Sequence, residues 1–380
     1  MENRHEHFMN LAMKLALKGK NKTSPNPMVG ALVVKDNRIL GRGYHEKAGL
    51  SHAEIIALDE AGEKSEGATL YVTLEPCVHF GQTPPCVERV IKSGVKEVIV
   101  GMIDPNPLNN GKGIDILKQN KIKVEVGFLE GELRKMNEVF IKYITKKLPF
   151  VTVKVGQSLD GKIATRQGDS KWVTSDKSRI FSHRLRAEYD AIMVGVNTAL
   201  RDNPKLDAWF SKKQPKKIIV DSELSVSENA NIFNPPVLEK PGVKETVALF
   251  ASKSSVIIVT LPVQSGQETE NRKILFQKAV ILEAKEKDGQ INLKDMMKKL
   301  AKMGVANIIV EGGGMLVGSL FDEGLVDKIL FFISPKIIGG KDAISSVMGK
   351  GVLRVDDAIK IKDIKLRHFG EDILIEGRVN

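Results

Sequence analysis

One short polar constellation constrains the fold of this chain more than any other feature of its sequence. The segment Ser51-His52-Ala53-Glu54 is followed by Cys77 and Cys86, the two cysteines of a 380-residue chain. One imidazole and two thiolates are three protein ligands suited to a catalytic Zn²⁺, whose fourth tetrahedral position is left for water. The chain must therefore bring His52, Cys77 and Cys86 together around one zinc ion.

The flanking residues predict that two of these ligands lie at helix N-termini. His52 precedes apolar residues at helical spacing that end at Gly62, and Cys86 follows two prolines and precedes a second such stretch. The helix dipole favours negative charge at this end, which lowers the pKa of a thiol placed there. Glu54, two residues past His52, is then close enough to reach a zinc-bound water without being a ligand.

This arrangement predicts hydrolytic deamination with Glu54 as the catalytic residue. Zinc lowers the pKa of a bound water from about 15.7 towards about 7, and Glu54 would shuttle its proton. H-x-E followed by P-C and a second cysteine is the signature of zinc nucleobase deaminases. Here eight residues separate the cysteines instead of two. The alternatives are two ordinary core thiols, or a structural zinc that His79 would close as fourth ligand.

Chain length and pattern predict two α/β domains. At 380 residues the chain exceeds the size at which one hydrophobic core keeps growing. Helical and strand patterns alternate in both halves, and in the first half they indicate a three-layer α/β domain. Pro149 ends a helical pattern and a β-rich run follows at residues 150–155. The predicted domains are residues 1–147 and 148–380.

The same pattern predicts individual elements. In the first half it predicts a hairpin, strands and one long helix, at residues 28–34 with 39–44, 69–74, 95–102, 123–126 and 129–143. In the second half it predicts strands at residues 191–194, 217–220, 255–260, 306–310 and 328–333, and a hairpin near 359–379. Residues 234–245 and 261–273 are rich in Pro, Gly, Glu and Lys, which predicts surface loops.

Charge and hydropathy limit the partners. The formal net charge of +11 is compatible with nucleic-acid binding, but the lysines are scattered and aromatic residues make up 5% of the chain. We therefore expect no nucleic-acid partner. The sequence has neither eighteen consecutive apolar residues nor the order of a signal peptide, so we expect a soluble cytoplasmic protein without a membrane partner.

A glycine-rich turn marks the second half. Glu311-Gly312-Gly313-Gly314 follows an apolar strand and precedes a helical pattern that ends near Gly324. Glycines at such a turn let backbone N–H groups approach a phosphate at the helix N-terminus. The motif is not G-x-G-x-x-G, so an ordinary Rossmann fold is not indicated. A turn that serves packing alone is the alternative.

Taken together, these motifs resemble the bacterial bifunctional riboflavin-biosynthesis family, in which a pyrimidine deaminase is fused to a reductase. The resemblance covers nearly the whole chain. In the first half it rests on the motifs at residues 23–30, 43–45, 52–54, 71–77, 83–86 and 104–107. In the second half it rests on those at residues 158–164, 170–175, 202–204 and the Glu311 turn.

For the first half, the resemblance implies a cytidine-deaminase-like domain that acts as a hydrolase. Its substrate would be 2,5-diamino-6-(5-phosphoribosylamino)-4(3H)-pyrimidinone, which would lose its 2-amino group. The residues expected to line the substrate site are Asn26, His45, His79, Asp104 and Asn106. Each could equally be a turn or capping residue.

For the second half, the resemblance implies a dihydrofolate-reductase-like domain, an NADPH-dependent oxidoreductase that would yield 5-amino-6-(5-phosphoribitylamino)uracil. The cofactor would contact Gly156, Trp172, Thr198, Asp202, Ser222, Gly313, Gly314, Met315, Leu316, Val317, Gly318 and Ser319. The substrate would contact Ser170, Arg186, Leu206 and Glu311, and Lys154 and Asp202 are hypothetical proton donors. The alternatives make Trp172 a core residue and Arg186 a surface charge.

Two departures from the family bear on its phosphate contacts. The family usually carries Lys or Arg at Gln82 and Arg at Trp209, and Lys205 or Lys212 would have to compensate. The predicted enzyme is thus a multifunctional, zinc- and NADPH-dependent protein of riboflavin biosynthesis with a small pyrimidine ribosyl phosphate as substrate. We expect a homo-oligomer, either a dimer or a tetramer. The alternative is a zinc deaminase of another nucleobase or of nucleic acid, with a non-catalytic or divergent second domain.

Overall fold

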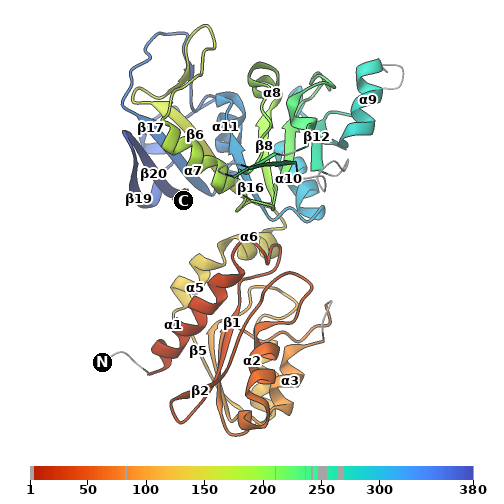
Figure 1. Ribbon diagram of the computed structural model, residues 1–380, viewed down its shortest axis with the longest axis vertical. Helices are drawn as coiled ribbons and strands as arrows, with labels where there is room; N and C mark the ends of the chain where they lie inside the picture. The colour runs from red at the N-terminus through yellow and green to blue at the C-terminus, as the bar shows by residue number, and fades with distance from the viewer. Residues whose placement is uncertain are drawn as a thin grey trace. The chain divides into compact units, whose positions relative to one another are not determined.

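The computed structural model describes residues 4–81, 84–209, 211–235, 237–240, 243–246, 255–262 and 269–379. The chain forms two compact units, Met1–Leu148 and Pro149–Asn380 (Figure 1). Each unit has its own β-sheet and its own hydrophobic core. In the part of the chain described here, no helix is long and apolar enough to cross a membrane.

The first unit is built on a five-stranded sheet in the order β2-β1-β3-β4-β5. β1 is antiparallel to β2 and β3, whereas β3, β4 and β5 run parallel. The strands are β1 (Gly30–Lys35), β2 (Arg38–Tyr44), β3 (Thr69–Leu74), β4 (Glu97–Met102) and β5 (Lys123–Val126). The helices are α1 (Arg4–Ala16), α2 (Ala53–Ala61), α3 (Cys86–Lys92), α4 (Lys112–Gln119), α5 (Glu130–Met136) and α6 (Glu138–Lys146).

Glycines in β1 and β2 show how helices cover both faces of this sheet. A β-carbon on Gly30 would lie 2.0 Å from the Ala12 carbonyl oxygen of α1, and one on Gly43 would lie 2.1 Å from that of Ala53 in α2. Gly43 pairs with Ala31, the neighbour of Gly30, and successive strand residues face opposite sides. α1 and α2 therefore pack on opposite faces, which confirms the predicted three-layer arrangement.

The prediction of one long helix over residues 129–143 is wrong, because the helix is interrupted at Asn137, between α5 and α6. This buried side chain accepts a hydrogen bond from the Met28 backbone N–H at 2.8 Å and donates one to the Met28 carbonyl at 3.1 Å. Asn137 leaves the helical conformation, with φ −104° and ψ 20°. A contact between residues 109 positions apart does not show in helical periodicity.

The second unit is built on a nine-stranded sheet in the order β13-β12-β9-β8-β16-β6-β17-β20-β19. The strands from β13 to β17 in this order are parallel, and β20 is antiparallel to β17 and β19. The strands are β6 (Phe150–Ser158), β8 (Ala191–Gly195), β9 (Lys216–Val220), β12 (Val256–Thr260), β13 (Val280–Glu283), β16 (Asn307–Glu311), β17 (Lys328–Ser334), β19 (Ile361–Phe369) and β20 (Asp372–Val379). The helices are α7 (Asp176–Arg186), α8 (Val196–Asp202), α9 (Glu270–Lys278), α10 (Leu293–Lys302) and α11 (Gly314–Asp322).

Three short strand pairs complete this unit. β7 (Lys162–Ala164) pairs with β18 (Ile344–Ser345), β14 (Glu286–Lys287) pairs with β15 (Gln290–Ile291), and β10 (Val237–Lys240) pairs with β11 (Val243–Thr246). β10 and all of β11 except Thr246 fall in a predicted loop, because composition alone does not distinguish a loop from a pair of short strands. Of the other predicted loop, residues 263–268 lie outside the described residues, and α9 already begins at Glu270.

Candidate active sites

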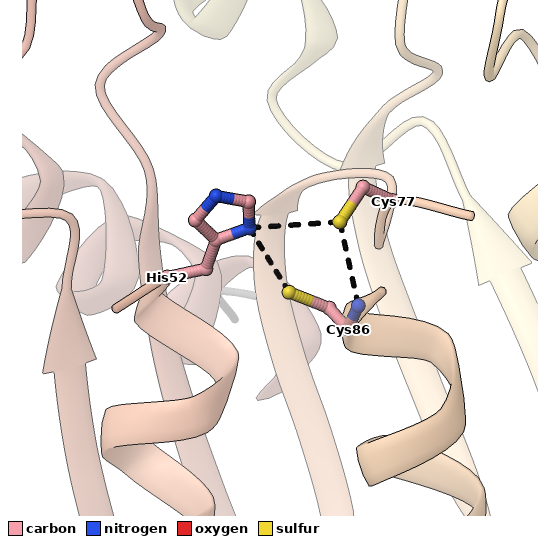
Figure 2. Close-up of side chains that lie close together, drawn as sticks. All are labelled: His52, Cys77 and Cys86. Carbon is pink, nitrogen blue, oxygen red and sulfur yellow. Dashed lines mark hydrogen bonds between the residues drawn. The ribbon is translucent and has the colours of Figure 1, made fainter. Parts of the chain in front are cut away.

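The predicted zinc ligands come together at the N-terminal ends of two helices (Figure 2). His52 immediately precedes α2, Cys86 is the first residue of α3, and Cys77 follows the end of β3. His52 Nδ1 lies 3.0 Å from Cys86 Sγ and 3.6 Å from Cys77 Sγ. The possible ligand atoms of the three residues all lie within 4.8 Å of one another.

These distances fit a tetrahedral zinc site. Zn–N bonds of about 2.0 Å and Zn–S bonds of about 2.3 Å at tetrahedral angles place nitrogen and sulfur donors about 3.5 Å apart. Of the residues that the structure describes, His52, Cys77 and Cys86 form the one cluster suited to a metal, and His79 is not part of it. The donor set therefore corresponds to a catalytic site with three protein ligands and one open position.

The thiols are prepared for metal binding by their contact with each other. The hydrogen bond from Cys86 lowers the pKa of the Cys77 thiol to about 4, and the same contact raises the pKa of Cys86. The Cys86 backbone N–H also points at Cys77 Sγ, 3.3 Å away. The lowered pKa favours the thiolate form of Cys77, which is the form that binds a metal.

Glu54 lies in the first turn of α2, directly beside this cluster. Its side chain is buried, with the residue 4% exposed. Burial raises the pKa of Glu54 to about 7, although the positive charge of His52 opposes this. A carboxyl group of this kind exchanges a proton readily near neutral pH.

His45 and Asn26 form a second polar pair next to His52. Asn26 Nδ2 lies 3.2 Å from His45 Nε2, and His45 Nδ1 lies 3.2 Å from the Ser51 carbonyl oxygen. An amide N–H donating to Nε2 leaves the imidazole proton on Nδ1, where it donates to the carbonyl. Burial lowers the pKa of His45, which favours the neutral ring. The His45 and His52 rings meet edge to face, with centroids 5.4 Å apart.

Asp104 and Asn106 are buried in the loop that follows β4. Asp104 Oδ1 accepts a hydrogen bond from the Asn106 backbone at 2.9 Å, and Asn106 Oδ1 accepts one from the Leu108 backbone at 3.1 Å. Burial raises the pKa of Asp104 to about 6. Both side chains stabilise the loop through these hydrogen bonds, in line with the alternative that they are turn or capping residues. Their contact with substrate stays a prediction.

Sequence reasoning missed two buried residues that tie this loop to the metal site. Asn109 Oδ1 accepts a hydrogen bond from the Val78 backbone, next to Cys77, at 2.9 Å, and Asn109 Nδ2 donates to Asp104 Oδ2 at 3.2 Å. Glu75 accepts hydrogen bonds from the backbone of Asp104 at 3.0 Å and of Gly111 at 2.9 Å. Only Glu75 gave a signal, as part of the motif at residues 71–77.

His79 also lies in this segment. Its Nδ1 atom is buried and has no hydrogen-bond partner among the described residues. An orphaned buried nitrogen suits a group that contacts a ligand. Gln82, the departure from the family in this half, lies outside the described residues.

A cavity of about 870 Å³ lies in the second unit, beyond the carboxyl ends of β6, β8 and β16. Crevices at the carboxyl ends of parallel strands are the usual binding sites of such sheets. The predicted residues that line it are Gly156, Ser170, Trp172, Arg186, Thr198, Asp202, Leu206, Ser222, Glu311, Gly313, Gly314, Met315, Leu316, Val317 and Ser319. Trp172 is 63% exposed, so it is not a core residue.

The glycines of the glycine-rich turn and of α11 serve two roles: some line the cavity, and Gly318 serves helix packing. Gly312 and Gly313 have positive φ angles of 76° and 74°, a conformation that favours glycine, and they lead into α11 at the cavity. Gly318 is the predicted cofactor residue that the structure places elsewhere. A β-carbon there would lie 1.7 Å from the Met348 carbonyl oxygen, so this glycine lets α11 approach the Met348 backbone.

Arg186 and Glu311 form a buried ion pair in the cavity wall. Arg186 Nε and Nη2 donate to the two Glu311 oxygens at 2.8 and 2.9 Å, and Nη1 donates to the Asp207 carbonyl at 2.9 Å. Lys154 Nζ lies 3.5 Å from the same carboxylate. Burial opposes ionisation, but Arg186 and Lys154 hold the pKa of Glu311 well below its usual range. Arg186 is therefore a buried partner of Glu311 and not a surface charge.

Trp209 stacks on His183, a residue of the cavity wall that the sequence analysis did not single out. The two rings are nearly parallel, at 10°, with centroids 3.5 Å apart. Burial and then the charge of Arg186 lower the pKa of His183 to about 4, so the ring is neutral. Lys205 and Lys212 do not line the cavity, whose described basic residues besides His183 are Lys154, Lys171, Arg179, Arg186 and Arg201.

Comparisons with known proteins agree with the division of the chain into two units. Residues 149–375 match the RibD C-terminal domain, and residues 2–102 match the cytidine and deoxycytidylate deaminase zinc-binding region. The riboflavin biosynthesis protein RibD of Aquifex aeolicus is 43% identical over 372 residues, which cover 97% of each chain. RibD of Escherichia coli is 36% identical and covers 97% of this chain and 98% of its own.

Solved structures match along the full length. RibD of Acinetobacter baumannii superposes with a TM-score of 0.83 at 30% identity, covering 99% of both chains. A diaminohydroxyphosphoribosylaminopyrimidine deaminase/5-amino-6-(5-phosphoribosylamino)uracil reductase of Thermotoga maritima superposes with a TM-score of 0.80 at 35% identity, again over 99% of both chains. The predicted cytidine-deaminase-like and dihydrofolate-reductase-like halves are thereby confirmed. This chain belongs to the RibD family, and it is a bifunctional deaminase and reductase of riboflavin biosynthesis.

Proposed function

We propose that the first unit deaminates 2,5-diamino-6-(5-phosphoribosylamino)-4(3H)-pyrimidinone and that the second reduces the product to 5-amino-6-(5-phosphoribitylamino)uracil. The observation that carries this proposal is the convergence of His52, Cys77 and Cys86 within 4.8 Å, with buried Glu54 beside them. The cavity of about 870 Å³ in the second unit supports the reductive step.

In the deamination, water replaces the 2-amino group of the ring and ammonia leaves. Zinc held by His52, Cys77 and Cys86 would supply the nucleophile by lowering the pKa of water. Glu54, in the first turn of α2, would take a proton from the attacking water and pass it to the departing amine. Neutral His45, held by Asn26 and Ser51, and the unpartnered Nδ1 of His79 would orient the substrate.

In the reduction, the C1′–O4′ bond of the ribosyl group breaks, C1′ gains hydrogen and O4′ gains a proton. NADPH bound in the cavity would supply the hydride. The backbone N–H groups at the start of α11 suit its diphosphate, because a helix N-terminus attracts negative charge. Lys154, which lines the cavity beside Glu311, is the candidate donor of the proton to O4′.

The two steps can be separated in one experiment. The diaminopyrimidinone phosphate is supplied with and without NADPH, while ammonia release and the absorbance of the reduced cofactor are followed. We expect ammonia in both cases and NADPH consumption only after ammonia release. Glu54→Gln should stop ammonia release while zinc stays bound, and NADPH consumption should return when the deaminated pyrimidine is supplied. Ammonia release at the parent rate by this variant would contradict the role of Glu54.

We also propose that the protein acts in the cytoplasm as a homo-oligomer. β19 is the last strand of its sheet and exposes Ile364 and Leu366, which are 58% and 64% accessible. The last strand of a sheet, when it carries exposed apolar side chains, is a favourable surface for a second copy of the chain. Sedimentation analysis should find a dimer or a tetramer, and replacement of both residues by lysine should shift it towards monomer. A parent chain that sediments as a monomer would refute this.

A further inference from the structure

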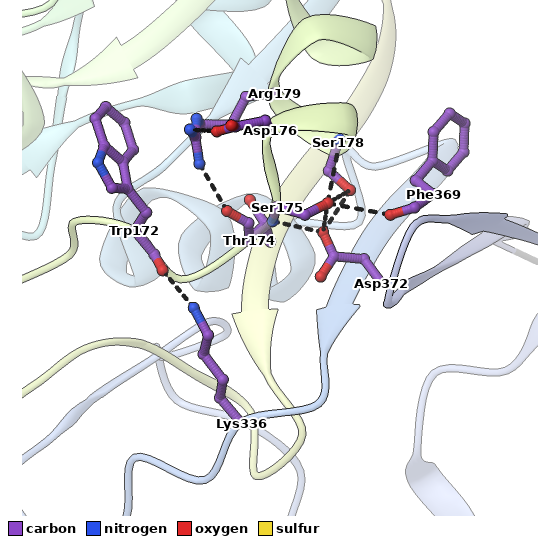
Figure 3. A network of polar contacts seen from close by, with 9 residues as sticks. All are labelled: Trp172, Thr174, Ser175, Asp176, Ser178, Arg179, Lys336, Phe369 and Asp372. Carbon is purple, nitrogen blue, oxygen red and sulfur yellow. Dashed lines mark hydrogen bonds and ion pairs between the residues drawn. The ribbon is translucent and has the colours of Figure 1, made fainter.

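The segment from Trp172 to Thr174 forms part of the cavity wall and is held by the side chains of Lys336 and Arg179 (Figure 3). Lys336, beyond the end of β17, donates a hydrogen bond to the Trp172 carbonyl at 2.7 Å. The guanidinium group of Arg179 lies 4.1 Å from the centre of the Trp172 ring and donates to the Thr174 carbonyl at 2.8 Å. The conformation of this segment therefore depends on where Arg179 and the start of α7 lie.

The first turn of α7 is fixed in turn by Asp372, the first residue of β20. Asp372 Oδ2 accepts hydrogen bonds from the Ser175 backbone N–H at 2.8 Å, the Ser175 hydroxyl at 2.8 Å and the Ser178 hydroxyl at 2.5 Å. Figure 3 shows these donors converging on one carboxylate oxygen. Ser175 is also the N-cap of α7, so the carboxylate lies where the helix dipole favours negative charge.

Burial makes this contact specific. Asp372 is 1% exposed, and a carboxylate taken out of water is costly unless hydrogen bonds compensate it. Its three donors come from two residues of the α7 N-terminus, 194 and 197 positions away in sequence. A shift of this turn would leave both the charge and its donors unsatisfied. The contact therefore permits one position of the turn.

On its other side, the segment packs against β6. A β-carbon on Gly156 would lie 3.0 Å from the Thr174 Cγ2 atom, so Thr174 rests on the strand where no side chain intervenes. Gly156, Trp172 and Thr174 all line the cavity. Asp372 is thus linked to the cavity wall through Ser175 and Ser178 in α7, and then through Arg179 and Thr174.

We propose that Asp372 is a positioning residue of the reductase site, which holds the Trp172–Thr174 segment ready for NADPH. The proposal rests on the proposed function for the identity of the cofactor. A segment that is already ordered loses less conformational entropy when the cofactor binds, and this is the source of the affinity gained. Asp372 acts through Ser175, Ser178 and Arg179 without itself lining the cavity.

The test compares Asp372→Asn, which keeps the shape and removes the charge, with Asp372→Ala. Asp190→Asn is the matched control, because Asp190 Oδ2 also accepts two backbone hydrogen bonds, at 3.0 and 3.2 Å, but lies before β8 at the end of the sheet away from the cavity. Amide hydrogen exchange of residues 172–178 is measured on the full chain without cofactor. The dissociation constant of NADPH and the rate of ammonia release are measured on the same samples.

We expect residues 172–178 to exchange faster in Asp372→Asn, and faster still in Asp372→Ala. NADPH binding should weaken about three- to tenfold in Asp372→Asn, the range expected when roughly one charged hydrogen bond is weakened. Ammonia release should keep the parent rate, and Asp190→Asn should change neither reductase readout. If Asp372→Ala does not fold, Asp372→Asn decides the matter.

A purely structural role would lower the melting temperature of Asp372→Asn while leaving both the exchange of residues 172–178 and the NADPH dissociation constant at parent values. That result would overturn the proposal. If the parent itself did not bind NADPH, the proposed function would fail. The exchange experiment on the cofactor-free chain would still decide whether Asp372 orders the segment.

Discussion

Replacing Glu311 by Gln should destabilise the second unit strongly, because it leaves Arg186 buried without its counter-charge. The parent pair makes two hydrogen bonds, of 2.8 and 2.9 Å, and Lys154 Nζ adds a second positive charge 3.5 Å from the carboxylate. Breaking a buried pair from one side costs about 3–5 kcal/mol, and the lower end applies here because glutamine keeps one acceptor. A loss of about 3 kcal/mol lowers the melting temperature of a unit of this size by about 6–12 °C.

The measurement is thermal and denaturant unfolding of the full chain, followed by a probe in each unit. Asp356→Asn is the matched control, since its partner Arg354 is exposed and the pair should contribute nothing measurable. The transition of the first unit should be unchanged in both variants. A Glu311→Gln transition that coincides with that of the parent would refute the reasoning.

The pH dependence gives a second check on the same pair. The pKa of Glu311 is depressed in the folded state, so its stabilisation is fully present above the unfolded-state pKa of about 4.3 and is lost as the pH falls towards the folded value. The difference between the parent and Glu311→Gln should therefore be constant from about pH 6 to 8 and shrink in acid below the unfolded-state pKa. A difference that grows as the pH falls would show that the carboxylate is not the stabilising group.

Three further outcomes follow from the geometry. Gly318→Ala should destabilise the second unit by about 1–3 kcal/mol, because the added β-carbon would lie 1.7 Å from the Met348 carbonyl oxygen. Gly131→Ala in α5 is the control, because its β-carbon would have nothing within 4 Å and should not destabilise the chain. Urea unfolding measures both variants. Asn109→Ala should weaken zinc binding about 10–100-fold in a chelator competition, because it frees the segment that carries Cys77. Cys77→Ser should yield a chain with much less zinc by elemental analysis, yet NADPH binding should persist.

The sequence allowed the metal site to be predicted because its chemistry is local. His52 immediately precedes one helix and Cys86 begins another, both helical patterns are visible in the neighbouring residues, and the ligand types themselves specify the metal. Most strands of the two large sheets were equally visible, since apolar runs such as that of β3 need only a few residues to show, but β13 was not predicted. The fold types of the two halves were implied by the resemblance to the riboflavin-biosynthesis family, which rests on the order of the motifs.

The features that could not be predicted depend on contacts between distant residues. Asn137 interrupts a helix through Met28, Asn109 reaches across to Val78, and Asp372 holds Ser175 from the far end of the chain. Single polar residues of this kind leave no periodic pattern, so only the folded structure identifies their partners. The stacking of Trp209 on His183 belongs to the same class.

The glycines of β2 have a consequence for how accurately the deaminase site is built. Gly41 and Gly43 bring the α2 main chain onto the strand at Ala57 and Ala53, with no layer of side chains between them. Side-chain layers can repack when a neighbour changes, but two main chains in contact have no rotamers to exchange. The position of α2, which carries Glu54 and follows His52, is thus fixed by main-chain contact with β2. Substitutions of side chains elsewhere in the core should therefore change this position little.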